Sequence, residues 1–122
     1  MDHRRVTGTG GEEKAAAFLE ARGVRVLERN YRSRYGEIDL LAKDGRYLIA
    51  VEVKTRRTAG SGTPAEAVGH RKIMRICRTF NRYRMEHRIP FTTPARFDVL
   101  EVKPGRAGDE FHWIKNAFEY IE

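Results

Sequence analysis

Two acidic residues and a lysine lie at a spacing that could support metal chemistry. Twelve residues separate Asp39 from Glu52, and Lys54 follows Glu52 by two positions. Apolar and polar residues alternate on both sides of Asp44-Gly45, a dipeptide that favours a two-residue hairpin turn. The segment therefore predicts two antiparallel strands that carry the acidic residues.

A turn at Asp44-Gly45 also predicts the pairing of the two strands. It places Lys43 opposite Arg46, Asp39 opposite Ala50, and Glu37 opposite Glu52. Because side chains alternate along a strand, one face should carry four charged side chains: Glu37, Asp39, Glu52 and Lys54. The other face should be an apolar wall of Ile38, Leu40, Ala42, Tyr47, Ile49, Val51 and Val53.

Carboxylates gathered on one face repel each other, and this repulsion raises at least one pKa unless a cation intervenes. Mg²⁺ takes oxygen ligands and often binds through one or two carboxylates. A lysine beside such an ion could polarise or deprotonate an attacking water. The alternative is a solvated charged face. Leu41, Leu48 and Ala50 on the same face favour a partly covered site over that alternative.

Several sequence motifs of the chain resemble those of a known family. Asp39, Glu52 and Lys54 across a hairpin resemble the core signature of the PD-(D/E)xK nuclease superfamily. The stretches GEIDLLAKDG and VEVKTR, followed by RFDV near the end, resemble the small bacterial YraN-type proteins, which are related to archaeal Holliday-junction resolvases. The resemblance runs from about Gly11 to about Phe118, which is essentially the whole chain.

This resemblance implies a metal-dependent endonuclease that cuts branched or structured DNA. In that hypothesis Asp39, Glu52 and the Val53 carbonyl bind Mg²⁺ or Mn²⁺, and Lys54 positions or activates water. Glu37 either completes the metal shell or holds Lys54 or an arginine. Resolvase-like nucleases usually act as dimers, so the resemblance also implies a homodimer. The alternatives are a nucleic-acid-binding protein that keeps the fold without turnover, and an interaction protein that uses its basic face on RNA or an acidic partner.

Two further residues are candidates from the helices. Glu12 shares a helix face with Ala16 and Leu19, whereas Glu13 should face solvent; capping of the helix N-terminus would also explain both glutamates. The resemblance implies a glutamate of the first helix above the metal, at the position of Glu12. Lys72 flanks the apolar edge of a later helix and could approach the sheet, where the resemblance also implies a lysine.

Positive charge dominates the composition. Lysine and arginine total 24 against 17 acidic residues, a net charge of +7, which is typical of nucleic-acid-binding proteins. DNA is the expected partner, with RNA not excluded. The single cysteine excludes an intrachain disulfide. No secretion signal or membrane-spanning stretch is visible, so a cytoplasmic protein without a membrane partner is expected.

Eight arginines are candidates for phosphate contacts. One group surrounds the acidic residues and the other forms a stripe on the later helix, opposite its apolar residues. Ion pairing with the acids is the alternative for the first group, and an ordinary solvated face is the alternative for the second. The eight are Arg32, Arg34, Arg56 and Arg57, then Arg71, Arg75, Arg78 and Arg82.

The periodicity predicts one α/β domain over residues 10–122, after a flexible basic leader at residues 1–9. Helices are expected at 10–22 and from Pro64 to about His87, with a mobile loop at 55–63 before the second. Strands are expected at 24–32, in the hairpin, at 95–103 and at 109–115, with a terminal helical turn at 116–120. This α-β-β-β-α-β-β order is that of a resolvase-like nuclease, with a central mixed sheet flanked by helices.

Overall fold

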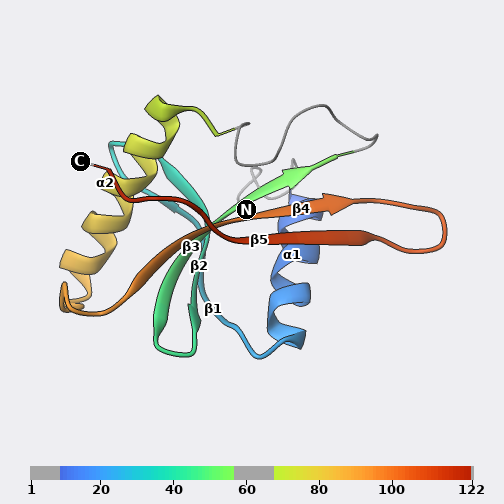
Figure 1. Ribbon diagram of the computed structural model, residues 1–122, viewed down its shortest axis with the longest axis horizontal. Coiled ribbons are helices and arrows are strands. Elements are labelled where there is room, and N and C mark those ends of the chain that lie inside the picture. Colours follow the sequence, from blue (N-terminus) through green and yellow to red (C-terminus); the bar gives the residue numbers. More distant parts are fainter. Residues whose placement is uncertain (1–8, 57–67, 122) are drawn as a thin grey trace, which may run out of the picture.

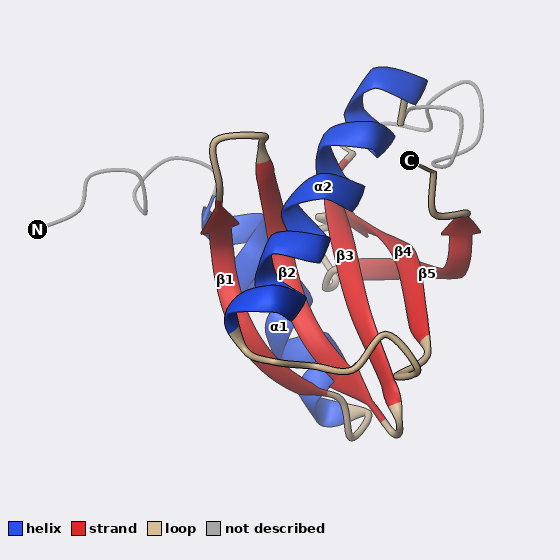
Figure 2. Cartoon of the chain, turned by 90° about the vertical axis from the view of Figure 1, so that its left-hand side faces the viewer, coloured by secondary structure: helices blue, strands red, loops and turns tan. Residues whose placement is uncertain are grey.

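The structure is a computed structural model, which describes residues 9–56 and 68–121. A five-stranded mixed sheet separates helix α1 from helix α2 (Figures 1 and 2). The elements follow the predicted order, as a single α/β domain: α1 (Thr9–Ala21), β1 (Arg25–Arg32), β2 (Glu37–Asp44), β3 (Tyr47–Thr55), α2 (His70–Glu86), β4 (Ala95–Lys103) and β5 (Glu110–Phe118).

The strands lie in the sheet in the order in which they occur in the chain. Strands β3 and β4 are parallel, and the other three neighbouring pairs are antiparallel. Antiparallel neighbours need only short connections, whereas the parallel pair needs a crossover, which contains α2. The sheet therefore consists of a three-stranded meander and a hairpin, joined by the crossover.

Each face of the sheet has its own hydrophobic core because a helix covers each face. On the α1 side, the core consists of strand residues packed under the helix: Leu40, Ala42, Ile49 and Val51 lie under Ala15, Ala16 and Leu19. Val53 is partly buried against this core. On the α2 side, Leu41, Leu48 and Ala50 pack under Ile76, Cys77 and Phe80. The expected partial cover of the charged face is therefore confirmed.

Two members of the predicted apolar wall lie elsewhere. Ile38 belongs to the core on the α2 side, because the ladder between β2 and β3 ends at Leu40 and the strand no longer follows the same pleat. Tyr47 is 37% exposed at the start of β3.

The predicted register of the hairpin was wrong. Asp44 pairs with Tyr47 and Lys43 with Leu48, so the turn residues are Gly45 and Arg46. Gly45 has a φ of 61° and occupies the first turn position, as in a type II′ turn. Asp44 instead ends β2, where its carboxylate accepts a hydrogen bond from Arg96 at 2.8 Å.

Two helix predictions also need correction. Helix α2 begins at His70 rather than Pro64; Val68 and Gly69 precede it, and residues 57–67 lie outside the described residues. The predicted helical turn at 116–120 is absent from the described chain, because β5 continues to Phe118. Asn116 has a φ of 56° and its backbone N–H donates to Asp98, which accommodates an irregularity in the β4–β5 pairing.

Residues 1–8 of the predicted leader and most of the predicted 55–63 loop lie outside the described residues, whereas Thr9 begins α1. No helix in the described part of the chain is long and apolar enough to cross a membrane.

Candidate functional site

Strands β2 and β3 and helix α2 enclose a cleft that contains the predicted acidic residues. Its volume is about 350 Å³. We call it the acidic cleft, and its lining residues are Gly36, Glu37, Asp39, Glu52, Lys72, Arg75 and Ile76. The cleft lies at the end of the sheet where β2 begins and β3 nears its end, because these strands are antiparallel.

Asp39 lies where the β2–β3 ladder ends. Leu40 is the β2 residue at this end of the ladder, and it pairs with Val51. Asp39 precedes Leu40, and its Oδ2 accepts a hydrogen bond from the backbone N–H of Val53 at 2.8 Å. A side-chain carboxylate of β2 thus accepts a hydrogen bond from the backbone of β3. Burial, followed by the charge of Glu52, raises the pKa of Asp39 to about 8, although the Val53 hydrogen bond acts in the opposite direction. A cation bound nearby would favour the charged form of Asp39 and lower this pKa.

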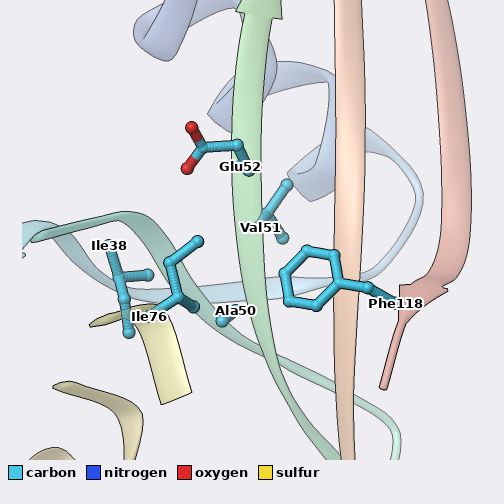
Figure 3. A pocket seen from close by; sticks show the side chains of 6 residues that line it. All are labelled: Ile38, Ala50, Val51, Glu52, Ile76 and Phe118. Carbon is cyan, nitrogen blue, oxygen red and sulfur yellow. The ribbon is translucent and has the colours of Figure 1, made fainter. Parts of the chain in front are cut away.

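Glu52 is the most buried of the acids in the cleft, with 5% of its surface exposed. It adjoins an apolar pocket of Ile38, Ala50, Val51, Ile76 and Phe118 (Figure 3). Figure 3 shows its carboxylate directed away from Val51 and Phe118. The carboxylate forms an ion pair with Lys72, and Lys54 Nζ lies 3.6 Å from Glu52 Oε2. Two lysines thus face one buried carboxylate.

The two lysines come from different elements. Lys54 projects from β3, two residues after Glu52 and on the same face, as predicted. Lys72 reaches over from the first turn of α2, also as predicted. The pKa of Lys72 is raised: burial acts to lower it, but the hydrogen bond and charge of Glu52 outweigh burial. Lys72 is therefore a stable cation beside Glu52.

Helix α1 places Glu12 beside the same acids. The Glu12 side chain interacts with Asn30 and Asp39, and burial is the main reason that its pKa is raised. A Cβ on Gly11 would lie 2.5 Å from the side-chain Oγ1 of Thr55, so the first turn of α1 approaches the end of β3 closely. Glu13 is exposed, as predicted.

Glu37 lies at the rim of the cleft. It pairs with Arg32 across the β1–β2 ladder, and Arg32 Nε lies 3.3 Å from Glu37 Oε2. Of the three alternatives for Glu37, the structure contains the contact with an arginine. The predicted pairing of Glu37 with Glu52 was wrong, because the register differs from the predicted one.

The eight candidate arginines separate into several groups. Arg32 pairs with Glu37, Arg56 with Glu101 at 2.6 Å, and Arg82 with Glu86 at 3.1 Å. The stripe on α2 is exposed as predicted, and its member Arg75 also lines the acidic cleft. Arg34 donates to Tyr35, and Arg57 lies outside the described residues.

Three residues near the cleft were not predicted from the sequence. Asn30 has a φ of 53° and contacts Glu12. Gly36 packs against α2, where an added Cβ would lie 3.1 Å from Arg75 Cβ. The Tyr35 ring lies 5.1 Å from the Arg34 guanidinium, whose hydrogen bond lowers the pKa of the tyrosine. An aromatic residue directly after Arg32 and Arg34 in a short turn was the available signal for Tyr35.

Comparison with known proteins identifies relatives over nearly the full chain. Residues 11–102 match the Uncharacterised protein family UPF0102. A UPF0102 protein of Methylococcus capsulatus is 44% identical over 117 residues, covering 96% of this chain and 94% of that protein. A UPF0102 protein of Symbiobacterium thermophilum is 50% identical and covers 94% and 97%, respectively. One from Rhodococcus jostii is 51% identical and covers 97% and 100%.

Proposed function

This chain belongs to the Uncharacterised protein family UPF0102, and we propose that it is a metal-dependent endonuclease that hydrolyses phosphodiester bonds of branched or structured DNA. One observation carries the proposal: Asp39 and Glu52 are held together in a cleft, with Lys54 and Lys72 beside them. Two buried carboxylates repel each other unless a cation or a basic side chain neutralises their charge. The family resemblance to YraN-type proteins agrees with this membership, and the nuclease chemistry is our proposal.

The donor set fits a hard divalent cation. Asp39 and Glu52 offer carboxylate oxygens; burial and then the charge of Glu52 raise the pKa of Asp39, and a cation would offset the repulsion between the two carboxylates. Within residues 9–56 and 68–121, no group of three acidic, histidine or cysteine side chains is placed to hold a metal ion, so the side chains would supply only two carboxylates. We therefore propose that Asp39, Glu52 and the Val53 carbonyl hold Mg²⁺ or Mn²⁺, with water completing the shell.

Each neighbouring residue has a role in this proposal. When bound, the metal supplies a more acidic water and charge stabilisation at the phosphate. Lys54 holds the attacking water through its amine and takes part in moving its proton. Lys72, a stable cation, balances Glu52 or the phosphate. Glu12 holds a second ion or the waters of the first. Glu37 orients Arg32 toward the substrate backbone.

A non-catalytic nucleic-acid-binding protein is the second candidate. It is favoured by the ion pair between Lys72 and Glu52, since a lysine already neutralises the buried carboxylate. The exposed arginine stripe on α2 would serve binding without chemistry. DNA as the partner, a homodimer and a cytoplasmic location are parts of the proposal in either case.

The test compares cleavage and retardation on labelled linear, flapped, four-way and single-stranded DNA, with matching RNA, in Mg²⁺ or Mn²⁺. Lys54→Ala should keep binding but lose cleavage by about 10²- to 10⁴-fold. Lys54→Arg should not restore it, because a guanidinium stays protonated. Lys43→Ala, at the far end of the same hairpin, is the matched control. A wild type that binds but cuts no substrate would reject the endonuclease in favour of the second candidate.

A further inference from the structure

A second cleft lies beside the C-terminal half of α2, on the flank of the helix that faces the end of the chain. Its volume is about 360 Å³. It is assembled from α2, the connection to β4, and the residues that follow β5. We call it the aromatic cleft, and its lining residues are Asn81, Arg84, Phe91, Ala95 and Tyr120.

Arg84 is the unusual residue of this cleft. Only 7% of its surface is exposed, and its Nη2 donates to the Pro90 carbonyl at 2.9 Å. Its Nε is buried and has no hydrogen-bond partner. No acidic residue of the described chain forms an ion pair with it. A buried guanidinium without a counter-charge is unfavourable, so an anionic ligand in the cleft would compensate it.

The other walls of the cleft are aromatic and open to solvent. Phe91 is 72% exposed and Tyr120 is 41% exposed. The Arg84 guanidinium lies 4.7 Å from the centre of the Phe91 ring, so positive charge and an exposed aromatic face adjoin each other. The Asn81 side chain donates to the Tyr120 hydroxyl, which fixes Tyr120 at the other side. A ligand here would have a flat apolar part and a negative group.

We propose that the aromatic cleft binds one unpaired nucleotide of a single-stranded nucleic acid, with its base stacked on Phe91 and its phosphate facing Arg84. Stacking on aromatic side chains beside positive charge is the general mode of single-strand binding. The exposed Arg78 and Arg82 on the same helix and the net charge of +7 favour a nucleic acid over an apolar ligand. Arg84 lies nine positions further along α2 than Arg75 of the acidic cleft, a rise of roughly 14 Å along the helix.

The test measures anisotropy of a fluorescent twelve-nucleotide oligo(dT) in EDTA. Phe91→Ala should weaken binding on the order of 10- to 100-fold, the range for loss of one stacked base. The slope of log affinity against log salt should not change, because phenylalanine carries no charge. Met85→Ala is the control, since Met85 is 68% exposed on the same helix but does not line the cleft.

A second variant tests whether Arg84 contacts a phosphate. Arg84→Gln should reduce the salt slope by roughly 0.7, the value for one single-strand phosphate contact. If circular dichroism shows that Arg84→Gln is unfolded, the affinity of Phe91→Ala is the result that tests the proposal. Wild-type affinity in Phe91→Ala, or an equal loss in Met85→Ala, would overturn the proposal. The binding assay contains no metal. A protein that cuts no DNA in the cleavage test can therefore still bind the oligonucleotide, so the two proposals fail independently.

Discussion

Replacing Asp39 with asparagine should stabilise the metal-free protein, and increasingly so as pH rises. Asparagine has nearly the same shape and keeps an oxygen that can accept the Val53 hydrogen bond. It removes the charge that burial and Glu52 disfavour. The substitution therefore separates the hydrogen bond of Asp39 from its electrostatic cost.

The sign and size follow from the pKa of Asp39, which rises from its ordinary value of 3.8 to about 8 in the folded protein. Between these values the unfolded chain has lost this proton and the folded chain keeps it. The free energy of unfolding therefore falls as pH rises, by at most about 1.4 kcal/mol per pH unit. The stabilising contribution is complete below about pH 4 and is lost as pH rises through 8. Between pH 5 and pH 8, Asp39→Asn should gain about 2–4 kcal/mol relative to wild type.

Urea unfolding in EDTA at pH 5, 6, 7 and 8 measures this difference. Asp109→Asn is the matched control, because Asp109 pairs with Lys14 outside the acidic cleft. Added Mg²⁺ should raise the free energy of unfolding of wild type, and not that of Asp39→Asn, by about 2.7 kcal/mol at a hundredfold excess over the dissociation constant. An Asp39→Asn protein with the wild-type pH profile and lower stability at every pH would refute the reasoning.

Three further outcomes are expected. Gly11→Ala should cost no more than about 1 kcal/mol in urea unfolding, because the clashing Thr55 Oγ1 belongs to an exposed side chain, and Gly11→Ala/Thr55→Ala should recover that loss; a double variant less stable than Gly11→Ala would contradict the close approach. Trp113→Phe should cost about 1–3 kcal/mol in the same assay, because the fully buried Asp98 loses one donor, and an unchanged midpoint would count against this. Neutralising the arginine stripe should reduce the salt slope of duplex binding by roughly 0.9 per true phosphate contact, whereas an unchanged slope would make it only a solvated face; the four changes are at Arg71, Arg75, Arg78 and Arg82.

The charged face of the hairpin could be predicted although its register could not. Both Asp44-Gly45 and Gly45-Arg46 place the glycine in a two-residue turn, so composition does not choose between them. Moving the turn by one residue changes each pairing by two positions in total, which preserves the side-chain alternation. Asp39, Glu52 and Lys54 therefore share a face in either register, and only their partners differ.

The features that the sequence did not predict depend on contacts between distant segments. Ile38 changes sides where the β2–β3 ladder ends, and no local pattern marks that point. The aromatic cleft joins Arg84, Phe91 and Tyr120, each unremarkable within its own segment. Periodicity reports which face of an element is apolar, but it does not report where two elements separate.

The order of the strands has a consequence for how the chain reaches this structure. All four strand pairs join strands that are consecutive in the chain. Three of them are joined by short connections, and the β3–β4 pair is joined by a long connection that contains α2. Closure of a long loop is entropically the slower step, so we expect the β1–β2–β3 meander to form before α2 docks. Until then Glu52 lacks Lys72, and Lys54 on β3 is the one lysine of this pair that lies beside Asp39 and Glu52. High salt or a divalent cation should therefore accelerate refolding.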